Sequence, residues 1–221
     1  MKHRITLTAA LLLVLTIAPA ASASPPGGFS AESESVGAEL QIDGGYLFVS
    51  ADNYSENYPE GSFEGSNTYL DFGVETETGF VYCFAYGEGG PTIDSKLAAA
   101  TVAAQIEGEC FVEEPPHEEG EAGLSHEENE EHEEPSGIPF TAAVDMTWSG
   151  TGNLLRSSGH STGPSDVCKD NSQWRDAATT GSITLFAEGV VDTTISPAES
   201  NWASISRWSY SCHAKGSPGA P

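Results

Sequence analysis

The sequence predicts an all-β protein, an antiparallel β-sandwich or barrel of about eight strands with a long acidic loop insertion. Residues 140–148 alternate apolar and polar side chains, with Phe, Ala, Val, Met and Trp at the even positions. Residues 100–112 repeat this two-residue period and place on one face Val102, Ala104, Ile106, Cys110 and Val112. This is the period of half-buried strands, and no helical period after the N-terminal segment is as regular.

Six further stretches complete the expected strands: residues 39–43, 46–51, 68–74, 80–86, 182–191 and 202–212. Gly44 and Gly45 predict a tight hairpin between the first two, and residues 75–79 predict another between the next two. In the last stretch Trp202, Trp208, Tyr210 and Cys212 share a face. Short strands separated by turn residues are typical of antiparallel sandwiches and barrels.

Residues 1–23 have the features of an export signal: Lys2 and Arg4, an apolar run over 5–18, and then small residues. Cleavage fits after Ala20 or after Ala23, and we favour the second. We then expect a flexible start over 24–37, a single β domain over 38–213 and a flexible end over 214–221. No second apolar run is long enough to span a membrane. The expected location is secreted or at the cell surface.

The chain is strongly acidic, with 33 Asp and Glu against 8 Lys and Arg. Loss of Lys2 and Arg4 with the signal leaves a net charge of −27. Nucleic acids and anionic membranes are recognised through basic patches, so neither is an expected partner. Cations, basic proteins and carbohydrate remain candidate partners, and the oligomeric state is not predicted.

The acidic insertion spans residues 113–137 and holds eleven Glu between Glu113 and Glu134. It also holds three imidazoles, at His117, His126 and His132. With Glu128, which shares a helical face with His132 if Ser125 caps a helix, they form a candidate divalent-cation site. We favour a solvated, self-repelling loop and no resident cofactor, because the spacing is not that of a preorganised metal site.

Four cysteines in an exported chain predict two disulfides, with three possible connectivities. We prefer Cys83 with Cys110 and Cys168 with Cys212, since each pair falls in elements that are neighbours along the chain.

One segment matches the G-x-S-x-G motif, Gly159 to Gly163, which presents a nucleophilic serine in α/β-hydrolases. Asp192 and His213 follow Ser161 in the order that such a triad requires. The surroundings favour a flexible loop instead, because the residues before Ser161 are mostly polar and Pro164 follows the motif. A secreted serine hydrolase using Ser161, Asp192 and His213 is therefore an alternative hypothesis.

Two polar regions are expected outside the strands. Residues 52–61 form a loop with oxygen ligands for calcium and with Tyr54 and Tyr58, which are suited to sugar stacking. Residues 149–180 form a longer polar region, in which a short helix follows Pro164 because Cys168, Asn171 and Trp174 recur at helical spacing.

The tryptophans divide into two groups. Trp148, Trp202 and Trp208 lie in expected strands and are assigned to the core, whereas Trp174 lies in a polar region and is a candidate ligand contact. Taken together, the residues favour a non-enzymatic extracellular binding or structural domain, with carbohydrate binding as the nearest variant.

Overall fold

The computed structural model describes residues 28–77, 79–113, 137–196 and 200–215. All regular structure in these ranges is β, which confirms the predicted antiparallel all-β class. The strands are β1 (Phe29–Ile42), β2 (Gly45–Tyr58), β3 (Gly61–Thr76), β4 (Gly79–Glu88), β5 (Thr92–Ile93), β6 (Ala99–Glu113), β7 (Ile138–Gly150), β8 (Leu155–Thr162), β9 (Asp166–Ala187), β10 (Val191–Ile195) and β11 (Ser200–Ala214).

The sheet closes on itself into a ring of β1, β2, β3, β4, β6, β7, β9 and β11. The longest strand, β9, holds the ring together by pairing with four others. Its C-terminal half pairs with β7 on one edge and β10 on the other, and its N-terminal half pairs with β8 and β11. Each ring strand therefore neighbours the next along the path, with β11 returning to β1.

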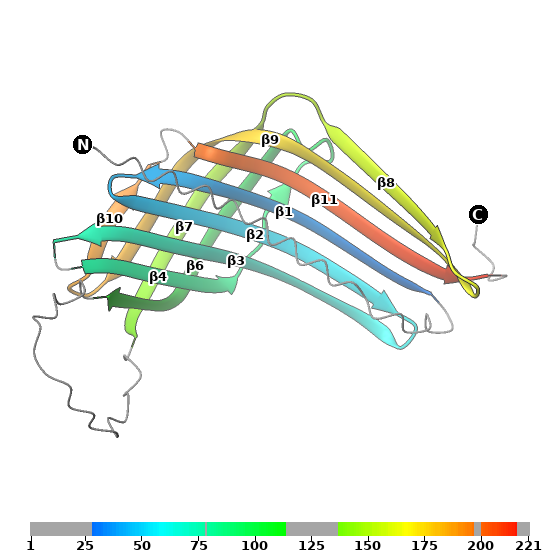
Figure 1. Ribbon diagram of the computed structural model, residues 1–221, viewed down its shortest axis with the longest axis horizontal. Helices are drawn as coiled ribbons and strands as arrows, with labels where there is room; N and C mark the ends of the chain where they lie inside the picture. Colours follow the sequence, from blue (N-terminus) through cyan, green and yellow to red (C-terminus); the bar gives the residue numbers. More distant parts are fainter. Residues whose placement is uncertain (1–27, 78, 114–136, 197–199, 216–221) are drawn as a thin grey trace, which may run out of the picture.

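Several strands run well beyond the ring (Figure 1). Beyond β4, β6 and β7, the paired ends of β8, β9, β11, β1, β2 and β3 continue as a curved six-stranded sheet, which we call the extension. We call the side of the sheet that continues the ring interior the inner face, and the opposite side the outer face. Because side chains alternate along each strand, every strand residue belongs to one of these faces.

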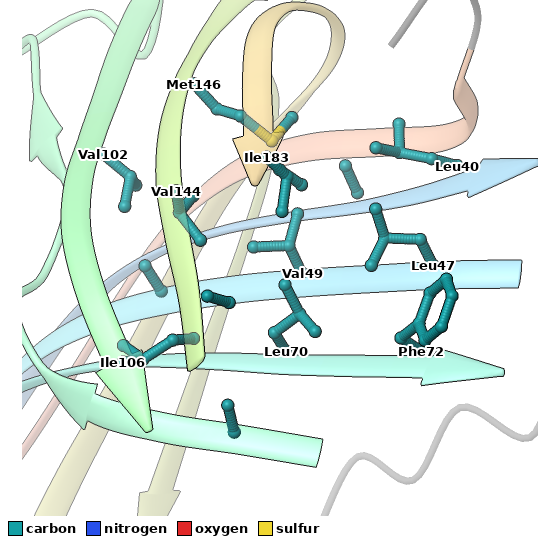
Figure 2. Packing of buried hydrophobic residues seen from close by; sticks show 14 of the residues in the cluster. Leu40, Leu47, Val49, Leu70, Phe72, Val102, Ile106, Val144, Met146 and Ile183 are labelled. Carbon is teal, nitrogen blue, oxygen red and sulfur yellow. The ribbon is translucent and has the colours of Figure 1, made fainter. Parts of the chain in front are cut away.

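The core fills the ring interior. Figure 2 shows aliphatic and aromatic side chains of β1, β2 and β3 pointing toward those of β6, β7 and β9, whose strands cross them steeply. The predicted inward residues of β7 are all buried, namely Phe140, Ala142, Val144, Met146 and Trp148. On β6 the prediction holds for Val102, Ile106 and Cys110, whereas Val112, near the end of the strand, is 42% exposed.

Both predicted hairpins are confirmed. In the first, Ile42 pairs with Gly45, so Asp43 and Gly44 form the turn, and Gly44 has a φ of 73°. Asp-Gly is the sequence that a tight hairpin turn with left-handed residues favours. The second hairpin joins β3 to β4.

The strands begin earlier and end later than predicted. The expected flexible start is wrong from Phe29 onward, because residues 29–37 of β1 pair with β2 on one side and β11 on the other. The expected polar loop over 52–61 is also wrong. Residues 52–58 continue β2, β3 begins at Gly61, and only Pro59 and Glu60 turn the chain.

The helix expected after Pro164 does not form, because residues 166–187 are the single strand β9. Cys168 and Trp174 both lie on its outer face. This segment pairs with β8 and β11 along its two edges, and such non-local pairing outweighs local spacing and propensity.

The preferred disulfide connectivity is confirmed. Cys83 joins Cys110 between β4 and β6 inside the ring, where both residues are 0% exposed. Cys168 joins Cys212 between β9 and β11 on the outer face of the extension. Each bridge links directly paired residues of adjacent strands.

Three predictions concern residues outside the described ranges: the export signal over 1–23, most of the acidic insertion, and the end of the chain from residue 216. In the described ranges there is no helix of the length and apolarity needed to cross a membrane.

Candidate functional site

The structure does not bring Ser161, Asp192 and His213 together. Ser161 lies on β8 opposite Cys168, and Asp192 lies on β10 opposite Phe186, so the two are separated by 18 residues of β9. This is roughly 60 Å of strand. His213 is near Ser161 in register but lies on the inner face, whereas Ser161 lies on the outer face. These residues form no triad in this fold.

The candidate cation ligands His117, His126, His132 and Glu128 lie outside the described residues. Within the ranges that the structure describes, no three His, Cys, Asp or Glu side chains are grouped as a metal site.

Two of the tryptophans assigned to the core are exposed. Trp148 is fully buried, but Trp202 is 48% and Trp208 is 40% exposed. The predicted shared face of β11 is real, yet it is the outer one, because the alternate residues Ala203 and Ile205 enter the core. Trp202 lies over Gly37 of β1, where an added Cβ would be 3.0 Å from the indole ring.

The basic side chains of the described strands are confined to one face of the sheet. In the described strands, no Lys, Arg or His occupies an outer-face position; the basic strand residues, all on the inner face, are Arg156, His160, Lys169, Arg175, Arg207 and His213. Carboxylates are frequent on the outer face, on several strands around the ring: Glu39, Asp52, Glu56, Asp71, Glu107, Glu109, Asp145, Asp170, Asp176 and Asp192. In the described strands the outer face therefore carries carboxylates and no basic side chain.

Exposed and half-buried aromatic rings gather on the outer face of the extension. We call them the tip cluster: Phe29, Tyr54, Tyr58, Phe63, Trp208 and Tyr210. The rings of Trp208 and Tyr210 are 5.9 Å apart and nearly parallel, at 8°. Phe29 continues the contact, 6.0 Å from Tyr210 and 4.9 Å from Tyr58. The cluster therefore crosses β11, β1 and β2 without a break.

The tip cluster lies close to the sheet. Tyr54 covers Gly65 of β3, since an added Cβ at Gly65 would be 2.3 Å from the phenol oxygen. Phe63 contacts Tyr54 with ring centroids 5.6 Å apart and remains 57% exposed. Exposed aromatic groups of this extent mark interaction surfaces more often than isolated apolar residues do. Trp174, the candidate ligand contact, is 37% exposed on the same face.

A second aromatic group lies on the outer face of the ring. It surrounds Asp71 of β3, and we call it the Asp71 cluster: Asp71, Tyr46, Phe48, Tyr69, Tyr82 and Phe84. Asp71 is paired in register with Phe48 on one side and Phe84 on the other. Tyr46 donates a hydrogen bond of 3.2 Å to the carboxylate.

A polar hollow of about 590 Å³ lies on the inner face of the extension, next to the ring. Its side chains include Glu32, Glu34, Glu64 and Arg207. The Arg207 Nε donates a 2.7 Å hydrogen bond to Glu34, and its Nη1 donates one of 3.3 Å to the carbonyl of Ser95.

Two residues that line this hollow form hydrogen bonds to the segment between β4 and β6, which closes the ring interior. Arg207 reaches Ser95, and Asn53 donates a 2.6 Å hydrogen bond to the carbonyl of Pro91. This segment inserts Leu97, which is fully buried and has a φ of 52°, into the core. Arg207 and Asn53 therefore have a structural role.

Sequence reasoning singled out Tyr54 and Tyr58 of the tip cluster as stacking residues but missed the other members of both aromatic clusters, although a signal was present. In β4 the aromatic residues Phe80, Tyr82, Phe84 and Tyr86 alternate with Val81, Cys83 and Ala85. The small residues face the narrow ring interior and are buried. Large rings at every second position, with small apolar residues between them, thus indicate an aromatic outer face.

Comparison with known proteins identifies no family. No family model matches the chain, and no curated protein matches it. One solved structure, the enduracididine biosynthesis enzyme MppR complexed with the condensation product of pyruvate and imidazole 4-carboxaldehyde, covers 86% of this chain and 88% of its own. Its identity is 6% and its TM-score 0.22, so the likeness supports no statement about fold or function.

Proposed function

We propose that this chain is an exported, non-enzymatic binding domain that holds a cationic macromolecule on the outer face of its sheet. The observation that carries the proposal is the composition of that face: exposed aromatic rings and carboxylates, with no basic side chain at the outer positions of the described strands. Export is supported by the signal-like residues 1–23 and by two disulfides, which persist in oxidising compartments.

Charge and aromaticity favour a cationic partner over a neutral one. An anionic surface attracts basic partners over a distance and speeds their encounter. At close range, the faces of Trp and Tyr rings attract ammonium and guanidinium groups, with about 0.5–2 kcal/mol for each contact. The outer face of the extension offers both, since Glu56 and Asp170 are interspersed with the tip cluster.

Carbohydrate is the alternative ligand, and the nearly parallel rings of Trp208 and Tyr210 are the observation that favours it. Nearly parallel aromatic rings on one face of a sheet can pack against the apolar faces of sugars. Carboxylates contribute less to a neutral glycan than to a cation, so we rank this ligand second.

Binding of the mature chain to poly-L-lysine, poly-L-glutamate and a panel of neutral glycans tests the proposal at physiological salt. We expect binding to poly-L-lysine alone. Replacing both Trp208 and Tyr210 by Ser weakens it about tenfold or more, because two cation–π contacts are lost.

Phe186→Ser is the matched control. Phe186 is also on the outer face and 49% exposed, but it lies at the opposite end of β9 from the tip cluster. This variant is expected to bind as the native chain does. Binding to a neutral glycan without binding to poly-L-lysine overturns the proposal in favour of carbohydrate.

A further inference from the structure

Asp71 is a partly desolvated carboxylate in an aromatic setting. Aromatic residues of β2 and β4 flank it in register, and Tyr46 and Tyr69 form hydrogen bonds to it. Burial raises the pKa of Asp71, and these two hydrogen bonds offset the effect only in part. Keeping this carboxylate ionised in the folded state therefore costs free energy of folding.

In the described strands, no basic side chain lies on the same face as Asp71. The inner-face positions hold all the basic residues of the described strands, so the sheet separates them from Asp71. Further carboxylates, Glu39 and Glu109, lie two strands away on either side of Asp71 in the same row across the sheet. A cation placed over Asp71 relieves this imbalance.

The surrounding rings select the kind of cation. Phe84 and Phe111 are stacked at 6.1 Å and 14°, and Tyr82 lies 6.1 Å from Phe84. Aromatic faces replace the hydration shell of an organic ammonium or guanidinium group, whereas a metal ion needs several oxygen or nitrogen ligands. The single carboxylate and the rings therefore suit an organic cation.

We propose that the Asp71 cluster is the seat for a cationic side chain of a basic polypeptide, which deepens the proposed function and rests on it. The carboxylate of Asp71 accepts the hydrogen bonds of the ammonium or guanidinium head. Phe48, Tyr82 and Phe84 enclose its alkyl stem.

The position of this seat suits an extended partner. Phe48 of the Asp71 cluster and Tyr54 of the tip cluster lie on the outer face of β2, six residues apart. Six residues of strand span roughly 20 Å, which is also the reach of six residues of an extended peptide. A basic chain lying along β2 therefore reaches both clusters at once, and joint engagement raises its overall affinity.

Titration of the mature chain with poly-L-lysine tests the seat through Asp71→Asn. We expect this variant to weaken binding about tenfold or more, because a desolvated charge pair is lost. Asp145→Asn is the control, since it removes one outer-face charge on β7, away from the cluster, and is expected to change affinity less than about twofold. The urea midpoint verifies that Asp71→Asn remains folded.

The outcomes separate this inference from the proposed function. Equal weakening by Asp71→Asn and Asp145→Asn, while the Trp208 and Tyr210 variant loses binding, overturns the proposed seat at Asp71 and leaves the proposed binding function standing.

A second probe, tetramethylammonium, examines the seat without a partner chain. It is expected to shift the NMR signals of Tyr46 and Tyr82 in the native chain and not in Asp71→Asn. Shifts without poly-L-lysine binding uphold the seat and overturn the polypeptide partner, whereas unmoved signals overturn the seat.

Discussion

The indole Nε1 of Trp148 donates a 3.0 Å hydrogen bond to the carbonyl oxygen of Gly37 across the interior of the ring. Trp148 belongs to β7 and Gly37 to β1, strands that do not pair with each other. The bond therefore joins opposite walls of the ring, and it satisfies the polar atom of a side chain that is 0% exposed.

Trp148→Phe is expected to lower the free energy of unfolding by about 1–3 kcal/mol, because it removes a buried donor and leaves unfilled volume. Urea denaturation followed by circular dichroism measures the change. Trp208→Phe, at an exposed position, is expected to stay within about 0.5 kcal/mol of the native chain. An equal loss in both variants contradicts the role of the cross-ring bond.

Gly181 has a backbone requirement that no other residue type meets. Its φ is 124°, and an added Cβ would lie 2.1 Å from the carbonyl oxygen of Asp145 on β7. Gly181→Ala is therefore expected to destabilise the chain by more than about 2 kcal/mol, through strain and a backbone clash.

Gly189→Ala separates these two causes. Gly189 also has a positive φ, of 75°, but nothing lies within 4 Å of an added Cβ. Its substitution is expected to cost about 1–2 kcal/mol from backbone strain alone. Thermal denaturation of the two variants in parallel makes the comparison, and a similar loss in both refutes the clash at Gly181.

Loss of each of the two disulfides is expected to destabilise a different region of the chain. The two bridges close loops with sequence separations of 27 and 44 residues. By lowering the entropy of the unfolded chain, each is expected to stabilise the fold by a similar amount, about 3.5–4 kcal/mol. Replacing Cys168 and Cys212 by Ala releases a bridge in the extension. We expect amide hydrogen exchange to rise over residues 166–175 and 206–214, while β6 and β7 stay protected.

Replacing Cys83 and Cys110 by Ala is the comparison, because this bridge lies in the buried core. Exchange is then expected to rise throughout the ring. If the Cys168 and Cys212 variant also loses protection in β6 and β7, the extension and the ring unfold as one unit.

The ring was predictable from sequence because its strands have one buried and one solvated face. In β7 the even residues from Phe140 to Trp148 enter the core, and this alternation is visible without the structure. The Cys83–Cys110 bridge joins two such strands, β4 and β6. The Cys168–Cys212 pairing followed only from the nearness of its two elements along the chain, because Cys168 lies in a strand and not in the expected helix.

The extension was not predictable in this way. Its inner face is polar, with residues such as Lys169 and Asn171, so β9 shows no alternation over 166–175. These strands are held by pairing along their edges, which local sequence does not reveal, and by the Cys168–Cys212 bridge. The sequence singles out Tyr54 and Tyr58 of the tip cluster as stacking residues, whereas Trp208 was assigned to the core because large aromatic residues usually lie there.

Alkaline pH is expected to destabilise the chain through Tyr46. Burial, followed by the charge of Asp71 and the hydrogen bond to it, raises the pKa of Tyr46 to about 12 in the folded state, from 10.0 as the ordinary value. Above pH 10 the unfolded chain therefore releases the Tyr46 proton before the folded chain does, and unfolding is favoured. The stabilisation is complete below pH 10 and is lost as the pH rises through 12.

Urea midpoints across this range are expected to fall with pH, and to fall less steeply in Tyr46→Phe. Tyr86→Phe removes a phenol outside the Asp71 cluster and is expected to retain the native slope. A Tyr46→Phe slope equal to that of the native chain would show that the folded state does not raise the pKa of Tyr46 in solution.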